Sequence, residues 1–258
     1  MSSLVKIIDQ TTDDVLSAPF RLHIHNDYEI LLFLEGDAEY AIEENIYDLA
    51  PRDLIVIRKH QLHRIHHRSN SRYRRMILNV SPEFFEVNSC MEYQEHFIHP
   101  SNIGSKIDAK TVIDSGIYDA FMRLRKFYQN DENTPIVKAL IIEILFLINN
   151  IKSYTKSETS SREKEIIAYI NKNFMREISL EDLERRFFIS KYHLCHIFPK
   201  ITGLTVHQYI TRKRLALAQE LVKSGESLSE AAKHCGFNSY SSFYRAYLNE
   251  YGVSPKKK

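Results

Sequence analysis

The sequence lacks tryptophan, and its 258 residues include only three cysteines, seven glycines and seven prolines. The odd number of cysteines and the absence of paired cysteine spacing argue against a disulfide framework or a structural zinc site, and they fit a reducing cytosol. Hydrophobic residues make up 43% and charged residues 26% of the chain, with 15 tyrosines and 14 phenylalanines. This composition excludes disordered and collagen-like proteins, and the length fits two domains with separate cores.

The chain also lacks a long apolar run. The longest, residues 139–151, contains Glu143 and falls short of the roughly 20 apolar residues that a membrane-spanning helix needs. The N-terminal segment MSSLVKIIDQTTDD shows neither the basic nor the apolar part of a secretory signal. We therefore expect a cytoplasmic protein that does not act in a membrane.

The formal net charge of +2 conceals an asymmetry between the two halves. Residues 1–160 contain 18 lysines and arginines against 23 aspartates and glutamates, a charge of −5. Residues 161–258 contain 17 against 10, a charge of +7. A basic half joined to an acidic half predicts that one end of the chain meets a polyanion, although a solvated surface has the same composition.

The first half has a strand-like pattern followed by a helical one. Short runs rich in β-branched and aromatic residues, separated by turn-forming stretches, favour a small barrel or sandwich. These runs are residues 30–34, 38–42, 54–57 and 75–80. From about residue 114 the apolar spacing becomes helical and predicts an antiparallel pair of helices.

The second helix of this pair is apolar on more than one face. It is therefore buried by the barrel, by its partner helix or by a second subunit. For the last case, a homodimer, the residues expected at the interface are Ile141, Ile144, Leu145 and Ile148.

A polar segment without periodicity, residues 152–162, predicts a linker. It divides the chain into an N-terminal domain over residues 1–151 and a helical domain over residues 163–258. Within the first domain we expect the barrel at about residues 1–110 and the helices at about 114–151. The predicted fold class is therefore α+β.

The helical half contains an internal repeat. The segments ISLEDLERRFFISKYHLCHIFPKITGLT and LSEAAKHCGFNSYSSFYRAYLNEYGVS match with an offset of 48 residues at Leu180 and Leu228 and 49 at Ser190 and Ser239. Each copy reads as a helix, a short turn and a second helix with an N-terminal serine cap, which is the helix-turn-helix pattern. A long helix over residues 206–223 is expected between the copies. Further N-cap candidates are Ser179, Thr205 and Ser227.

The stretch GFNSYSSFYRAYLNEYGVSP, residues 236–255, resembles the signature of the AraC/XylS family of bacterial transcription regulators. The segment SKYHLCHIFPKITG, followed by Tyr209 and the run from Arg214, is similar to the matching part of the first copy. The resemblance covers about the last hundred residues. It implies two recognition helices that enter successive major-groove segments of double-stranded DNA, a homodimer, contact with RNA polymerase, and activation of transcription.

Helical spacing leaves polar residues on the outer face of each expected recognition helix. Arg245 is the best candidate for a bidentate guanine contact, with a phosphate contact as the alternative. Tyr192 and Cys195 either contact bases or are plain surface, and the resemblance implies base contact for them and for His196. The residues from Arg212 to Arg214 are expected to hold the DNA backbone. The predicted DNA-binding set is Lys191, Tyr192, Cys195, His196, Lys200, Arg214, Ser239, Tyr240, Ser241, Tyr244 and Arg245.

The N-terminal half resembles a cupin. The stretch HIHNDYEILLFLEG, residues 23–36, is similar to the first cupin motif, and APRDLIVIRKHQLHRI is similar to the second, with Arg52 where glycine is usual. The resemblance implies a cupin-like β-barrel that encloses a small-molecule effector. Candidate pocket residues are Arg21, His23, His25, Glu29, Tyr40 and His63.

Four of these residues, His23, His25, Glu29 and His63, also have the types and spacing of a metal site. They leave open a second function, a metal-dependent cupin enzyme with a DNA-binding appendage. The other interpretation is that these residues serve barrel packing and hydrogen bonding and bind no metal. For a regulatory cupin we expect the latter, and so no metal, no cofactor and no catalytic residue. The sequence as a whole predicts an effector-responsive, sequence-specific DNA-binding regulator, an activator.

Overall fold

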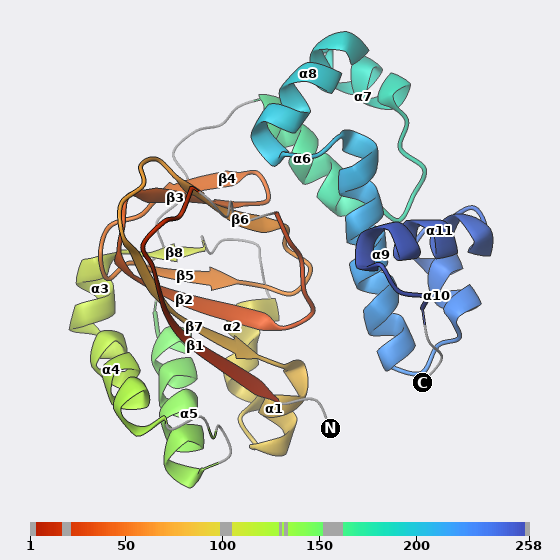
Figure 1. The fold of residues 1–258 in the computed structure, drawn as a ribbon. Helices are drawn as coiled ribbons and strands as arrows, with labels where there is room; N and C mark the ends of the chain where they lie inside the picture. Colours follow the sequence, from red (N-terminus) through yellow and green to blue (C-terminus); the bar gives the residue numbers. More distant parts are fainter. Residues whose placement is uncertain are drawn as a thin grey trace.

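The computed structural model describes residues 4–16, 22–98, 105–128, 131, 134–151 and 162–255 (Figure 1). Residues 152–161 of the predicted linker and the predicted pocket residue Arg21 lie outside these ranges. The strands are β1 (Val5–Thr12), β2 (Tyr28–Glu35), β3 (Ala38–Ile42), β4 (Asn45–Asp48), β5 (Leu54–Ile57), β6 (His63–His67), β7 (Tyr73–Val80) and β8 (Lys106–Ile107).

The strands form two antiparallel sheets, which confirms the α+β class. One sheet has the order β1-β7-β2-β5-β8 and the other the order β4-β3-β6. Aromatic and aliphatic side chains from both sheets, among them Leu31, Phe33, Tyr40 and Ile65, pack together between them. In the described ranges the sheets do not close into a hydrogen-bonded barrel, so the cupin-like unit is an open two-sheet sandwich.

Strand β2 is continuously apolar because both of its faces are covered. Ile30 and Leu32 face the helices that cover the five-stranded sheet, whereas Leu31 and Phe33 face the second sheet. Because side chains alternate between the two faces, a strand covered on both sides needs apolar residues at successive positions. Glu29 points to the same face as Leu31 and is the buried charged residue of this strand.

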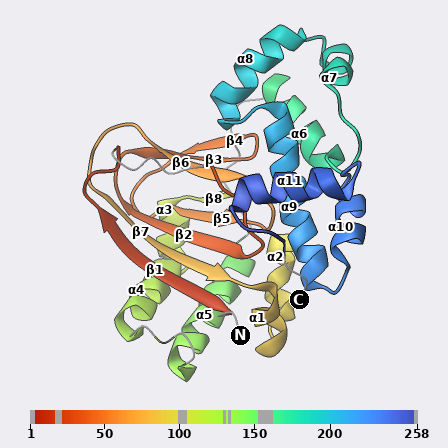
Figure 2. The ribbon, with the colours of Figure 1, turned by 45° about the vertical axis from the view of Figure 1, so that its right-hand side comes forward.

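Helices cover the outer face of the five-stranded sheet. They are α1 (Pro82–Val87), α2 (Glu95–Ile98), α3 (Ala109–Asp114), α4 (Ile117–Phe127) and α5 (Pro135–Asn149), with a 3-10 turn, η1, at Met91–Gln94. Helices α4 and α5 lie side by side along the sheet (Figures 1 and 2), as the predicted helix pair requires.

The buried face of α5 corrects the dimer prediction. The four side chains expected at a dimer interface are all 0% exposed within a single subunit, where they pack on α4 and the sheet; they are Ile141, Ile144, Leu145 and Ile148. The helix is apolar on several faces because the sheet and its partner helix cover it. These four residues therefore have no free surface to offer a second subunit.

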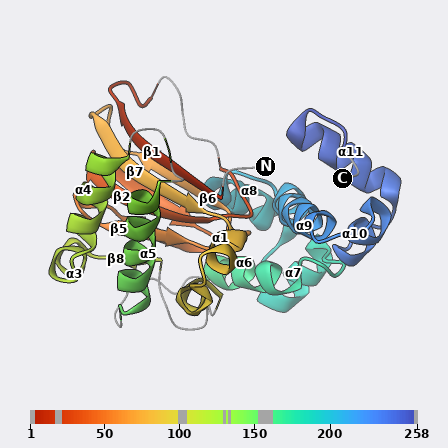
Figure 3. The same cartoon turned by 90° about the horizontal axis from the view of Figure 1, so that it is seen from below.

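The C-terminal half is helical throughout its described residues. Its helices are α6 (Arg162–Asn173), α7 (Leu180–Phe187), α8 (Lys191–Thr202), α9 (Val206–Lys223), α10 (Leu228–His234) and α11 (Tyr240–Tyr251). Figures 1 and 3 show α6–α8 at one end of α9 and α10–α11 at the other. The first turns of α9 contribute to the core with α6–α8, and later residues such as Leu215 and Ala218 contribute to a second core with α10 and α11.

The predicted helix starts are confirmed by their capping bonds. The hydroxyls of Ser179, Ser190, Thr205, Ser227 and Ser239 each accept a hydrogen bond from a backbone N–H in the first turn of the following helix. Such a cap satisfies one of the N–H groups that a helix start leaves without an internal partner. The two helix-turn-helix copies and the long helix between them therefore occur as predicted.

Candidate nucleic-acid interface and sensor site

Helix α8 presents its predicted polar face to solvent. Leu194 and Phe198 are buried, whereas Tyr192 is 75% exposed and Cys195 is exposed on the same face. The Nδ1 of His196 donates to the Tyr192 carbonyl at 2.8 Å, and the two rings lie 4.3 Å apart between centroids. This contact holds the imidazole against the phenol ring one turn earlier. Lys200 is also exposed, in the last turn.

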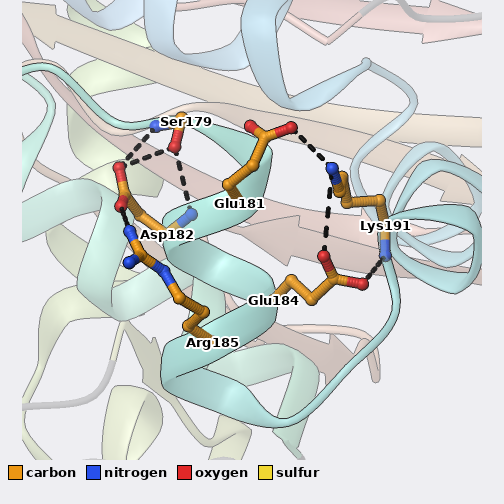
Figure 4. Close-up of polar contacts among 6 residues, drawn as sticks. All are labelled: Ser179, Glu181, Asp182, Glu184, Arg185 and Lys191. Carbon is orange, nitrogen blue, oxygen red and sulfur yellow. Dashed lines mark hydrogen bonds and ion pairs between the residues drawn. The ribbon is translucent and has the colours of Figure 1, made fainter.

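Lys191 is engaged by helix α7 (Figure 4). Its Nζ lies 2.6 Å from Glu181 Oε1 and 4.0 Å from Glu184 Oε2. Its backbone N–H donates to Glu184 Oε1 at 3.2 Å. The hydrogen bond to Glu181 raises the pKa of Lys191 and lowers the pKa of Glu181. The ammonium group therefore ties α8 to α7.

Helix α11 presents the second polar face. Phe243 is 1% exposed, while Tyr240 and Tyr244 are 43% and 37% exposed. Ser241 and Arg245 are also exposed on this side. These positions lie in the first two turns, where a recognition helix meets base edges.

Ser239, from the same predicted set, has a defined structural role. Its hydroxyl accepts from the Ser242 N–H at 3.1 Å, and the two hydroxyls lie 3.0 Å apart. The residue is the N-cap of α11, so its side chain is directed at the helix backbone.

Arg214 does not join the exposed recognition residues. Its Nε donates to the Phe174 carbonyl and its Nη2 to the Arg176 carbonyl, both at 2.7 Å. Its guanidinium lies over the Phe237 ring, and burial lowers its pKa. These bonds hold the end of α6 against α9, and a contact of Arg214 with DNA stays a prediction.

The neighbouring basic residues of α9 also contact protein. Arg212 Nη1 donates to the Leu22 carbonyl at 2.9 Å, and its Nε lies 2.9 Å from Glu250 Oε1. Lys213 is 6% exposed. The run from Arg212 to Arg214 therefore joins parts of the chain to each other in this structure, and its contact with the DNA backbone stays a prediction.

The predicted pocket residues of the N-terminal half come together. The segment before β2 forms a β-bridge between His23 and His63, and their rings lie 4.1 Å apart. The rings of His25 and His63 lie 4.8 Å apart, and the Tyr40 hydroxyl donates to Glu29 Oε1 at 3.3 Å. The potential ligand atoms of His23, His25, Glu29 and His63 all lie within 4.8 Å of one another.

The charges in this cluster are strongly coupled. Glu29 is 4% exposed, and burial alone would raise its pKa. The hydrogen bond from His25 and the charges of the three histidines outweigh burial and lower the Glu29 pKa to about 2. Burial and the charge of His23 lower the pKa of His63 to about 3. Burial also disfavours the charged form of His25, but its contacts with Glu29 raise its pKa overall.

Backbone carbonyls orient two of the imidazoles. The Nδ1 of His25 donates to the Asp27 carbonyl at 2.9 Å, and the Nδ1 of His63 donates to the Gln61 carbonyl at 2.8 Å. Both Nε2 atoms are thereby directed into the cluster. The Nε2 of His25 lies 3.2 Å from Glu29 Oε2. The Nε2 of His63 is buried without a hydrogen-bond partner among the described residues.

A polar contact that was not predicted joins the two halves. Glu43, in the turn after β3, accepts from the Leu62 N–H at 2.7 Å and from Lys213 Nζ at 2.8 Å. The Tyr209 hydroxyl also donates to the Glu43 carboxylate. The Lys213 and Glu43 side chains are only 7% and 6% exposed, so this is a buried ion pair. The signal in the sequence is the spacing of Tyr209 and Lys213, which places both on one face of α9.

A second ion-pair group lies beside the first. Lys59 Nζ lies 2.7 Å from Glu220 Oε1, and His60 Nε2 lies 2.9 Å from Glu220 Oε2. The hydrogen bond with His60, together with Lys59, lowers the Glu220 pKa to about 2 against the opposing effect of burial. A cleft of about 590 Å³ opens here and is lined by residues of both halves, including Tyr28, Arg58, Gln94, Asn171 and Leu217.

Two family models match the chain. The model of the AraC-like ligand binding domain matches residues 17–145, half of the chain, and a helix-turn-helix domain model matches residues 183–258. In the described residues no helix has the length and apolarity that would let it span a membrane.

Curated relatives extend over nearly the whole chain. The probable transcriptional regulator LumQ of Photobacterium leiognathi is 25% identical over 91% of this chain and 90% of its own. The HTH-type transcriptional activator RhaS of Escherichia coli O157:H7 is 23% identical over 93% and 87%.

Solved structures are also similar to the chain. ToxT of Vibrio cholerae is 14% identical, covering 98% of this chain and 97% of that chain, with a TM-score of 0.39. The DNA-binding domain of AdpA in complex with a target DNA is 27% identical, covering 37% and 87%, with a TM-score of 0.35. On the match of the family models, the chain belongs to the AraC/XylS family of DNA-binding transcription regulators.

Proposed function

We propose that the chain is an effector-responsive transcription activator that reads two successive major-groove segments per subunit. The observation that carries the proposal is the pair of capped helices at the two ends of α9, each with an exposed polar and aromatic face. The reading residues in this proposal are Tyr192, Cys195, His196 and Lys200 on α8, and Tyr240, Ser241, Tyr244 and Arg245 on α11. Ser239 and Lys191 support these helices from within the domain.

The proposal includes the domain division and the partners. Residues 1–151 form the sensor domain and residues 163–258 the DNA-binding domain, joined by the linker at 152–162. The protein acts as a homodimer with RNA polymerase in the bacterial cytoplasm, where chromosomal DNA lies. Because the inner face of α5 is covered, the dimer uses other surfaces, and sedimentation of the purified protein tests its existence.

Selection of duplexes from a random pool tests the DNA-binding part. We expect the full chain to enrich a site that spans two major-groove segments. Affinity should fall steeply with salt, since each neutralised phosphate contributes a slope of about −0.9 in log K against log salt. Equal binding to the selected duplex and to a scrambled duplex at moderate salt would contradict the proposal.

The histidine cluster favours a second candidate, a metal-dependent enzyme of the cupin kind. Such an enzyme needs open metal positions and a path for its substrate. Here His63 is 0% and Glu29 is 4% exposed, and the Tyr40 hydroxyl occupies one carboxylate oxygen. On the side of His23 and His25 the cluster is open to solvent. Because the chain belongs to a family of DNA-binding transcription regulators, we propose that the cluster serves sensing and that the protein is not an enzyme.

A further inference from the structure

The cluster of His23, His25, Glu29 and His63 has the donor set of a transition-metal site. Three imidazoles and one carboxylate suit zinc, iron, manganese or cobalt. The four ligand atoms converge within 4.8 Å although they come from three segments, the stretch before β2, β2 itself and β6. A buried carboxylate with three imidazoles around it needs positive charge to offset the cost of its burial.

Hydrogen bonds to the backbone orient two of the imidazoles in the cluster. Backbone carbonyls accept the Nδ1 protons of His25 and His63, the usual outer-shell arrangement of metal-binding imidazoles. This leaves the Nε2 of His63 as a buried lone pair without a partner among the described residues. The Nε2 of His25 faces a carboxylate oxygen, so this contact is favourable only with a proton or another cation between the two atoms.

We propose that His23, His25, Glu29 and His63 bind one divalent transition-metal ion, and that residues 60–63 transmit its binding to α9 and thereby to the DNA-binding helices. The inference rests on the proposed regulatory function. It reverses the metal-free expectation from the sequence, because the unpartnered Nε2 of His63 is visible only in the structure.

The route to α9 begins at His60. Its backbone N–H donates to the His25 carbonyl at 3.0 Å, and its own carbonyl accepts from Lys213 Nζ at 2.6 Å. One peptide segment therefore contacts both a proposed ligand and the helix that joins the two helix-turn-helix copies. His60 is also held at φ 59°, a left-handed conformation that is uncommon for residues other than glycine.

A second route runs through Leu62 and Glu43. The Glu43 N–H donates to the Leu62 carbonyl at 2.8 Å, and the Glu43 carboxylate accepts from the Leu62 N–H. The same carboxylate binds Lys213 and Tyr209 of α9. His63, the next residue after Leu62, is a proposed ligand. A metal ion held by His25 and His63 would therefore be connected to both ends of residues 60–63, through the His25 carbonyl that accepts from the His60 N–H and through His63 itself.

The binding site is tested on the full-length chain after removal of metal with a chelator. Co²⁺ is titrated in and followed by its visible absorption and by calorimetry, with elemental analysis for stoichiometry. We expect one Co²⁺ per chain and at least about a tenfold loss of affinity in His25→Asn. The His25 side chain is 23% exposed, so the variant should fold, which circular dichroism checks. His66→Asn is the matched control, since His66 lies on β6 with its side chain 58% exposed and should leave binding unchanged.

The transmission is tested with Zn²⁺ and the duplex selected by the metal-free protein. We expect Zn²⁺ to change the DNA affinity of the unmodified chain by at least about fivefold. In the double variant Glu43→Gln, Lys213→Met we expect the same Co²⁺ stoichiometry but no effect of Zn²⁺ on DNA affinity.

Each negative outcome has a distinct meaning. No Co²⁺ binding to the unmodified chain, or unchanged binding in His25→Asn, overturns the metal site, while selective DNA binding by the metal-free chain would still support the regulator. A Zn²⁺ effect that survives in the double variant overturns the route through Glu43 and Lys213. Stoichiometric Co²⁺ without any selective DNA binding overturns the proposed function and the regulatory role together.

Discussion

The buried pair between Glu43 and Lys213 gives the strongest prediction about how the two halves are held together. We expect Lys213→Met to destabilise the chain, because it leaves the Glu43 carboxylate buried without its cation. Removing one partner of a buried pair costs roughly 3–5 kcal/mol. Glu43 keeps hydrogen bonds from the Leu62 N–H and the Tyr209 hydroxyl, so the lower end, about 3 kcal/mol, is expected.

The double variant Glu43→Gln, Lys213→Met distinguishes the cost of leaving a charge unpaired from the cost of altered packing. It replaces two buried charges by neutral groups of similar size, which is often close to neutral for stability. We therefore expect the double variant to be at least about 1 kcal/mol more stable than Lys213→Met alone. The control is Lys223→Met, which changes an exposed lysine of the same helix and should alter stability by less than about 0.5 kcal/mol.

The assay is unfolding in urea, monitored by far-ultraviolet circular dichroism and by tyrosine fluorescence. Tyrosine is the fluorophore because the chain has no tryptophan. Two domains can unfold in separate steps, so both signals are fitted for each variant. The predicted loss must appear in the transition that includes α9. If Lys213→Met unfolds at the same urea concentration as the unmodified chain, the buried pair does not hold the halves together. If the double variant is as unstable as Lys213→Met, the loss reflects packing rather than charge.

Four further predictions concern single residues. Arg245→Ala should cost about 1–3 kcal/mol in binding the selected duplex and relax the preference at one base pair; uniform weakening across duplexes would indicate a phosphate contact. Gly236→Ala should destabilise the second helix-turn-helix by about 2 kcal/mol or more in urea unfolding, because its φ is +88° and a Cβ would lie 2.1 Å from the Met175 carbonyl oxygen. Ser227→Ala should cost about 1 kcal/mol in the same assay by removing the cap of α10, and an unchanged midpoint would contradict that role. Glu29, with its pKa lowered from 4.5 to about 2, contributes stability that is complete above pH 4.5 and lost as the pH falls toward 2, so Glu29→Gln should flatten the acid limb of the stability curve.

The helical half was predictable because its signals are local. A serine hydroxyl that caps a helix bonds an N–H two or three residues later, so Ser190 and Ser239 mark helix starts from the sequence alone. Apolar spacing then assigned the buried face of α8, with Leu194 and Phe198 inward. The histidine cluster could also be predicted from the sequence, because the cupin-like spacing indicated which residues would come together.

The sequence was least informative where the residue that contacts a side chain lies far away along the chain. The run from Arg212 to Arg214 is basic and adjacent to a recognition helix, which is also the pattern of a phosphate-binding surface. Its donors instead meet carbonyls at Leu22, Phe174 and His60. Helix α5 posed the same difficulty, because an apolar face does not identify what covers it. Only the fold showed that the sheet and α4 bury that face.

Helix α9 is the element through which a change in the sensor can reach both recognition helices. Tyr209 packs in the core with α6–α8, Leu215 packs in the core with α10 and α11, and Lys213, between them, binds the sensor. Both sensor residues at this contact, Glu43 and His60, have positive φ values of 53° and 59° although neither is glycine. Such conformations persist only when the surrounding structure holds them, and here the surroundings include α9 itself. Release of α9 would let the turn at Glu43 and the segment at His60 relax together. By the proposed route, a ligand that tightens or loosens residues 60–63 would therefore act on both recognition helices through α9.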